Sequence, residues 1–156
     1  EAATLKEVLA KYRSGDLLEA LAAWSENNPV ASAGPRSLRA QLELAVGRVN
    51  EAERLLAEVP NEAPAKLALT ELIATVRGDA SNQPLAKGGS ASEWLAHSYT
   101  LQSRADLLGA RAAAKQAAEL APQSGFAHAR LAELEFAFGH HKSTLAELKQ
   151  AYELSP

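Results

Sequence analysis

The chain of 156 residues contains no cysteine and no methionine, and only 5% of its residues are aromatic. The absence of cysteine excludes disulfide bonds and thiol catalysis, and it leaves the redox compartment open. No apolar run approaches the roughly 18–20 residues that a membrane-spanning helix needs, so we expect no direct membrane insertion. β-Branched residues are also sparse, whereas Ala, Leu and Glu are common. This composition favours helices and argues against a large sheet.

Charge of either sign is dispersed along the chain. The net charge is −3 and the basic residues form no cluster, so the sequence shows no electrostatic footprint for nucleic acid. The many carboxylates are typical of solvated helix faces. No phosphate-binding glycine loop, Ser/His/Asp motif or His-x3-His pair occurs, and the imidazoles are His97, His128, His140 and His141. We therefore expect a protein that is not an enzyme, with no catalytic residue, no metal and no cofactor.

An internal repeat is the most informative feature of the sequence. The octapeptides 115–122 and 149–156 agree at six of eight positions and lie 34 residues apart. A fixed period of this length is typical of stacked helical repeats. Each unit is then one helical hairpin, which cannot bury its apolar face without a neighbour.

Two clear repeats of 34 residues occupy 91–156. In the first, Ser90 or Ser92 is placed to cap a helix, Asp106 to cap the next helix, and Pro122 to end it. The second repeat has the same order, with Gly139 at the turn between its helices.

The first part of the chain, residues 1–62, reads as two shorter and more degenerate repeats. Gly15 and Gly47 mark their turns, and we expect their second helices to stop early, at Pro29 and Pro60. The whole chain, 1–156, is predicted to be a single domain.

Residues 63–90 break the regular order. An apolar stripe predicts a helix over Ala65–Arg77, but the segment 79–90 is rich in Gly, Asn and Pro, as loops are. This helix has lost its partner, or has only a single turn in its place. The simpler interpretation is a tolerated surface insertion, and a functional loop is the alternative.

The two clear repeats resemble the tetratricopeptide repeat family, whose pattern is Trp-x2-Leu-Gly-x2-Tyr, then Ala-x3-Phe, a further Ala and a closing Pro. The matching positions are Trp94, His97, Ser98, Leu101, Ala110, Ala114, Ala117 and Pro122, then His128, Leu131, Ala132, Glu135, Thr144, Leu148, Ala151 and Pro156. His97 and Glu135 depart from the apolar consensus. The resemblance implies an all-α fold, a right-handed solenoid of helical hairpins with about nine helices.

The resemblance also implies a concave groove lined by the first helix of each hairpin. The positions that face it correspond to Leu95, Tyr99 and Gln102 in one repeat and to Ala129, Glu133 and Phe136 in the next, with Phe126 and Arg130 adjoining them. We expect a non-catalytic module that binds a peptide or partner helix of unknown identity in this groove. The Lys/Asn/Arg clamp that some members use for C-terminal carboxylates is not reproduced.

The carboxyl-terminal edge is a second candidate surface. Leu145, Leu148 and Tyr152 stand where a further repeat or a capping helix would normally cover them. Because the chain has no methionine and stops on the last residue of a repeat, we expect it to be a piece of a longer protein. The edge is then covered by the rest of that protein or by self-association. A structural or oligomerising segment is therefore the alternative function.

Overall fold

The computed structural model describes residues 5–24, 33–78 and 89–155, and these residues form nine α-helices and no strand. The helices are α1 (Leu5–Ser14), α2 (Leu17–Ala23), α3 (Ala33–Ala45), α4 (Val49–Ala57), α5 (Pro64–Val76), α6 (Ala91–Ser103), α7 (Leu107–Leu120), α8 (Gly125–Ala137) and α9 (His141–Leu154). The prediction of an all-α chain is confirmed for this part of the sequence. None of these helices is both long and apolar enough to cross a bilayer.

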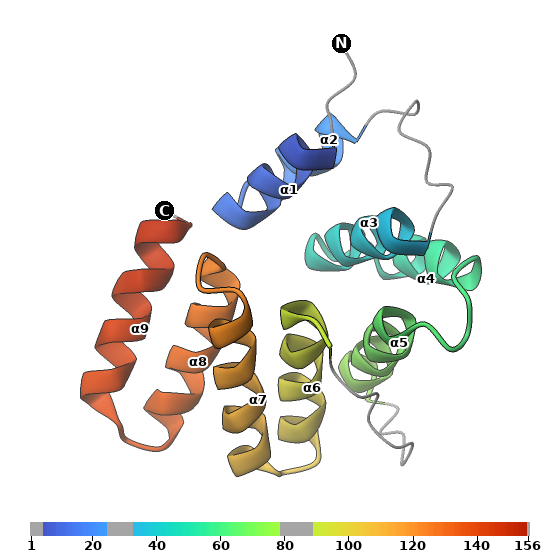
Figure 1. Ribbon diagram of the computed structural model, residues 1–156. Helices are drawn as coiled ribbons and strands as arrows, with labels where there is room; N and C mark the ends of the chain where they lie inside the picture. Colours follow the sequence, from blue (N-terminus) through green and yellow to red (C-terminus); the bar gives the residue numbers. More distant parts are fainter. Residues whose placement is uncertain (1–4, 25–32, 79–88, 156) are drawn as a thin grey trace.

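The helices pack as adjacent pairs along the chain (Figure 1). α1 lies on α2, α3 on α4, α6 on α7 and α8 on α9, while α5 packs against α6 and has no second helix of its own among the described residues. In three of the helix pairs, the turn between the two helices contains a glycine with positive φ. Gly139, with φ of +75°, is the glycine in the turn between α8 and α9. The α6–α7 turn instead holds Ala105 at +62°, a conformation that costs an L-residue free energy.

Polar caps fix where the later helices begin. Ser90 accepts a hydrogen bond from the backbone N–H of Glu93, whose carboxylate accepts one from the backbone N–H of Ser90, so the two form a capping box. Asp106 accepts from the backbone N–H of Gly109 at 2.8 Å. The caps predicted at Ser90 and Asp106 are therefore confirmed.

The ends of the early second helices depart from the prediction. α2 ends at Ala23 and α4 at Ala57, so α4 stops three residues before Pro60. Pro29 and most of the predicted loop, residues 79–88, lie outside the described residues.

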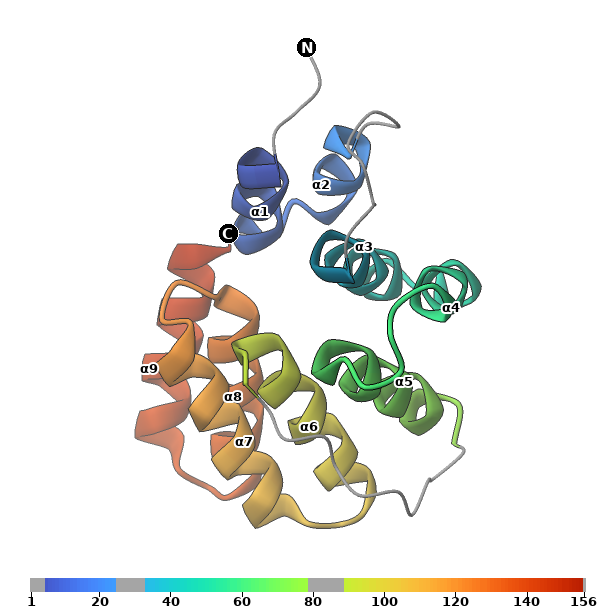
Figure 2. The ribbon, with the colours of Figure 1, turned by 45° about the vertical axis from the view of Figure 1, so that its right-hand side comes forward.

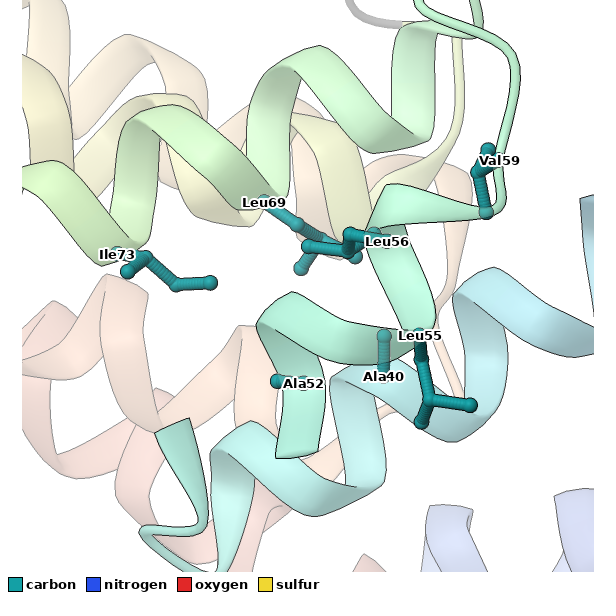
Figure 3. Close-up of a cluster of buried hydrophobic side chains, with 7 residues drawn as sticks. All are labelled: Ala40, Ala52, Leu55, Leu56, Val59, Leu69 and Ile73. Carbon is teal, nitrogen blue, oxygen red and sulfur yellow. The ribbon is translucent and has the colours of Figure 1, made fainter. Parts of the chain in front are cut away.

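Small side chains let the helices approach closely. The buried face of α7 consists of Ala110, Ala113, Ala114, Ala117 and Ala118, and it packs against Leu131 and Leu134 of α8. A second cluster joins α3, α4 and α5 (Figure 3), and its members are Ala40, Ala52, Leu55, Leu56, Val59, Leu69 and Ile73. The core is thus a series of layers between neighbouring helices.

A polar network replaces the apolar consensus at Glu135. Its buried carboxylate accepts from Arg111 Nε at 2.6 Å and lies 2.5 Å from Nδ1 of His140. Burial opposes ionisation, but the hydrogen bonds from Arg111 and His140 outweigh it and lower the pKa of Glu135. The α7–α8 and α8–α9 contacts are therefore tied together by charge as well as by packing.

The first and last helix pairs meet, so that the helices complete a circuit (Figures 1 and 2). α1 lies against α8, where the rings of Tyr12 and Phe126 stack with their centroids 5.5 Å apart. The hydroxyl of Ser155, just after α9, donates to the backbone carbonyl of Arg13 at 3.0 Å. The end of α1 and the end of α9 are thereby held side by side.

Candidate binding cavity

A cavity of about 500 Å³ lies inside this circuit of helices. Its walls come from α1, α3, α5, α6 and α8, that is, from the first helix of each pair together with α5, and from the start of α4. The lining residues are Tyr12, Gln41, Leu44, Ala45, Gly47, Val49, Leu69, Leu72, Val76, Ser92, Leu95, Ala96, Tyr99, Phe126, Ala129, Arg130 and Glu133. Most of these side chains are aliphatic or aromatic, so the interior is largely apolar.

Most of the residues assigned to the groove from the sequence line this cavity. These are Leu95, Tyr99, Phe126, Ala129, Arg130 and Glu133. Gln102 lies next to it and accepts a hydrogen bond from Arg130.

Phe136 is not part of the lining. Its side chain is 64% exposed, and its ring lies 6.0 Å from that of His141. Phe136 is seven residues beyond Ala129 on α8, a displacement of about 10 Å along the helix axis. The residue is therefore on the expected helix but beyond the end of the cavity.

Arg130 forms the polar part of the wall and is only 2% exposed. Its Nε donates to the hydroxyl of Ser98 at 2.9 Å, and its Nη2 donates to the Ser98 carbonyl at 3.1 Å and to the Gln102 side chain. Its Nη1 donates to Oε2 of Glu133 at 2.8 Å. The guanidinium also lies over the ring of Tyr99, 3.9 Å from the centroid. These contacts offset the cost of removing the charge from water and hold the side chain in one position.

Glu133 supplies the compensating charge from the edge of the cavity. Its side chain is 56% exposed, so one carboxylate reaches solvent while pairing with a guanidinium that is almost completely buried. The two residues are three apart on α8, where side chains share a helix face.

Two tyrosines in the lining are neutral in the physiological pH range. Burial raises the pKa of Tyr99, and the nearby Arg130 guanidinium only partly offsets this effect. Burial also raises the pKa of Tyr12, and a hydrogen bond with the Ser92 side chain lowers it in part. Neither phenol adds charge to the cavity.

Tyr12 also joins three helices that are far apart in the sequence. From α1 it stacks on Phe126 of α8 and hydrogen bonds to Ser92 of α6. The same side chain therefore lines the cavity and holds α1 against the other helices.

Tyr12 is not among the residues predicted to line the groove, although the repeat register marks its position. Aligning Asp16 with Asp106 at the two turns places Tyr12 at the position of Gln102. Aligning Gly15 with Gly47 places it at the position of Leu44, another lining residue.

The outer face of α9 carries the residues predicted to form an edge interface. Leu145 is 69% exposed, Leu148 48% and Tyr152 72%. The adjoining face of α9 is buried against α8 through Thr144 and Ala151. Three large apolar side chains therefore share one exposed face, and their role as an interface stays a prediction.

His97 and His128 both lie against neighbouring residues. His97 is buried beside Trp94, with ring centroids 5.6 Å apart. His128 lies between the carboxylate of Glu147, at 2.7 Å, and the carbonyl of Pro122, at 3.1 Å. Within the described residues, no three side chains of the types that bind metals come together.

Comparisons of the sequence with protein-family models and with curated proteins, and of the structure with solved structures, found no match.

Proposed function

We propose that the chain is a non-catalytic interaction module of the tetratricopeptide type, a right-handed solenoid of hairpins that binds a short segment of a partner protein in its inner cavity. The observation that supports this function best is the cavity itself. Side chains from six helices converge on it, and the residues singled out from the repeat pattern are prominent among them.

The size of the cavity favours a short segment over a long partner helix. An α-helix with its side chains is at least about 10 Å wide and rises 1.5 Å per residue, so each residue occupies roughly 120 Å³. A cavity of about 500 Å³ then accepts about four residues. This volume is also within the range that ligand pockets commonly have, roughly 300–1,000 Å³.

The chemistry of the lining fits recognition of apolar side chains. Aromatic residues and arginine are the side chains most often found at the energetic centres of protein interfaces. Here Tyr99 and Arg130 hold each other in place, so little side-chain freedom is lost when a partner binds.

Selection of peptides from a phage-displayed random library tests the proposal. Peptides enriched on the wild-type chain should bind Tyr99→Ala and Ala129→Trp at least about tenfold more weakly, because one change removes an anchor and the other fills the cavity. Phe136→Ala is the matched control, since it removes an exposed aromatic side chain of α8 that lies outside the cavity. Peptides that bind all four chains equally would contradict the assignment.

Self-association through α9 is the second candidate function, and the exposed stripe at Leu145, Leu148 and Tyr152 favours it. A stable interface buries about 800 Å² on each partner, whereas three side chains expose a few hundred Å² at most. Because the exposed area of these three side chains is smaller than a stable interface needs, self-association is the second candidate. Sedimentation over a concentration range should then show a reversible dimer that Leu148→Gln with Tyr152→Gln abolishes, and a monomer at every concentration excludes it.

A further inference from the structure

The charged groups of the cavity balance each other. Among the described residues that line it, Arg130 and Glu133 are the only two with ionised side chains, and they form an ion pair at 2.8 Å. Tyr12 and Tyr99 are neutral, and the remaining lining residues carry no charge. The cavity therefore offers apolar surface, and its lining carries no net charge.

The two partners of this ion pair differ in how firmly they are held. Arg130 is fixed in the wall by Ser98, Gln102 and the ring of Tyr99. Glu133 is held by the pair itself and is more than half exposed. Because Glu133 is attached to the same helix, it competes for the guanidinium at a high effective concentration. An anion that enters must displace it or remain without a counter-ion.

A charged group on the ligand would therefore lose its hydration in the cavity and find no opposite charge that is not already paired. An uncharged aromatic or branched aliphatic group loses little hydration and gains the whole apolar lining. We infer that the cavity selects an uncharged apolar side chain of the partner segment, and that Glu133 sets this selectivity by neutralising Arg130. This inference rests on the proposed function, because it assumes that the cavity is the binding site.

Two fluorescent probes of nearly the same shape test the selectivity. N-phenyl-1-naphthylamine is uncharged, and 8-anilino-1-naphthalenesulfonate carries a sulfonate on the same ring system. The wild-type chain should bind the uncharged probe at least about tenfold more tightly. Glu133→Gln should raise the affinity for the anionic probe about tenfold and change that for the uncharged probe by less than about twofold, because Arg130 then lacks its counter-ion.

Matched variants separate this effect from other causes. Glu119→Gln removes the same charge from a glutamate whose side chain is also 56% exposed, on α7 away from the cavity, and should leave both affinities unchanged. Ala129→Trp fills the cavity and should abolish binding of both probes, whereas Ala112→Trp, at an exposed position on α7, should not. Thermal unfolding of each variant verifies that it is folded.

The outcomes distinguish the selectivity from the proposed function. Equal affinities for the two probes in the wild-type chain, or an unchanged ratio in Glu133→Gln, would overturn the role of Glu133 while leaving the cavity as the binding site. If Ala129→Trp weakens neither probe, the cavity is not where they bind. The selectivity and the proposed function then fail together.

Discussion

Replacement of Tyr12 tests whether the first and last helix pairs hold each other in place. The side chain has three contributions that alanine removes: the burial of its ring, the stacking on Phe126 and the hydrogen bond to Ser92. Alanine keeps the helix propensity of α1, so the change reports on tertiary contacts.

The expected loss in the free energy of unfolding follows from these three contributions. Truncation of a fully buried aromatic side chain costs about 3–5 kcal/mol, and Tyr12 is half-buried. We therefore expect Tyr12→Ala to lower the free energy of unfolding by about 2–3 kcal/mol. Tyr12→Phe keeps the ring and loses only the hydrogen bond, so its cost should be about 1 kcal/mol.

Urea denaturation followed by circular dichroism measures both changes. Tyr152→Ala is the matched control, because this tyrosine is 72% exposed on α9 and its loss should cost less than about 0.5 kcal/mol. A double-mutant cycle with Phe126→Ala should give a coupling of about 1 kcal/mol for the stacked pair. A cost below about 0.5 kcal/mol for Tyr12→Ala, or a coupling of zero, would refute the contact between α1 and α8.

Three further changes test the packing, capping and titration of the fold. Leu134→Ala should lower the free energy of unfolding by roughly 3–5 kcal/mol, since the Leu134 side chain is 1% exposed. Leu108 is 69% exposed, so Leu108→Ala should lower it by less than about 0.5 kcal/mol. Equal losses for the two variants in urea denaturation would contradict the assignment of Leu134 to the core. Ser90→Ala should cost about 1 kcal/mol by removing the cap of α6, and thermal unfolding with no loss would contradict the capping box. Burial lowers the pKa of His97, so the unfolded chain binds a proton at this residue more readily than the folded chain does. Neutral His97 therefore does not weaken the fold above the ordinary histidine pKa of about 6.5, and stability is lost as the pH falls below that value. In denaturation between pH 7 and 5, His97→Leu should therefore lose less stability than the wild type, and an equal loss would exclude His97 as the cause.

The positions of the later helices were predictable because capping and turn residues close in the sequence determine where each helix begins and ends. Ser90 and Asp106 cap helices, and Gly139 adopts a positive φ in a turn. Each of these effects depends on only a few neighbouring residues. The 34-residue period then indicated which helices pair.

The contact between α1 and α8 was not predictable in this way. Tyr12 and Phe126 are far apart in the sequence, and their contact depends on how each helix between them packs on its neighbours. That packing depends on the sizes of the side chains at every interface, such as the alanines of α7. No local pattern reports the combined effect of these interfaces.

The candidate site was predictable in its helix faces but not in its extent. The resemblance to tetratricopeptide repeats implied that Tyr99, Ala129 and Glu133 face inward, and these residues line the cavity. The same resemblance included Phe136, because a repeat pattern defines a helix face and not the length of a cavity along it. The bonds of Arg130 to Ser98 were not expected, since they connect neighbouring pairs and depend on their relative position.

The most direct test of the account is a methyl-resolved NMR titration of the leucine-labelled chain with N-phenyl-1-naphthylamine. The methyl resonances of Leu44, Leu72 and Leu95, which line the cavity, should shift on addition of the probe, whereas those of Leu145 and Leu148 on the outer face of α9 should not. Shifts confined to the α9 leucines, with the cavity leucines unaffected, would contradict the claim that the inner cavity is the binding site.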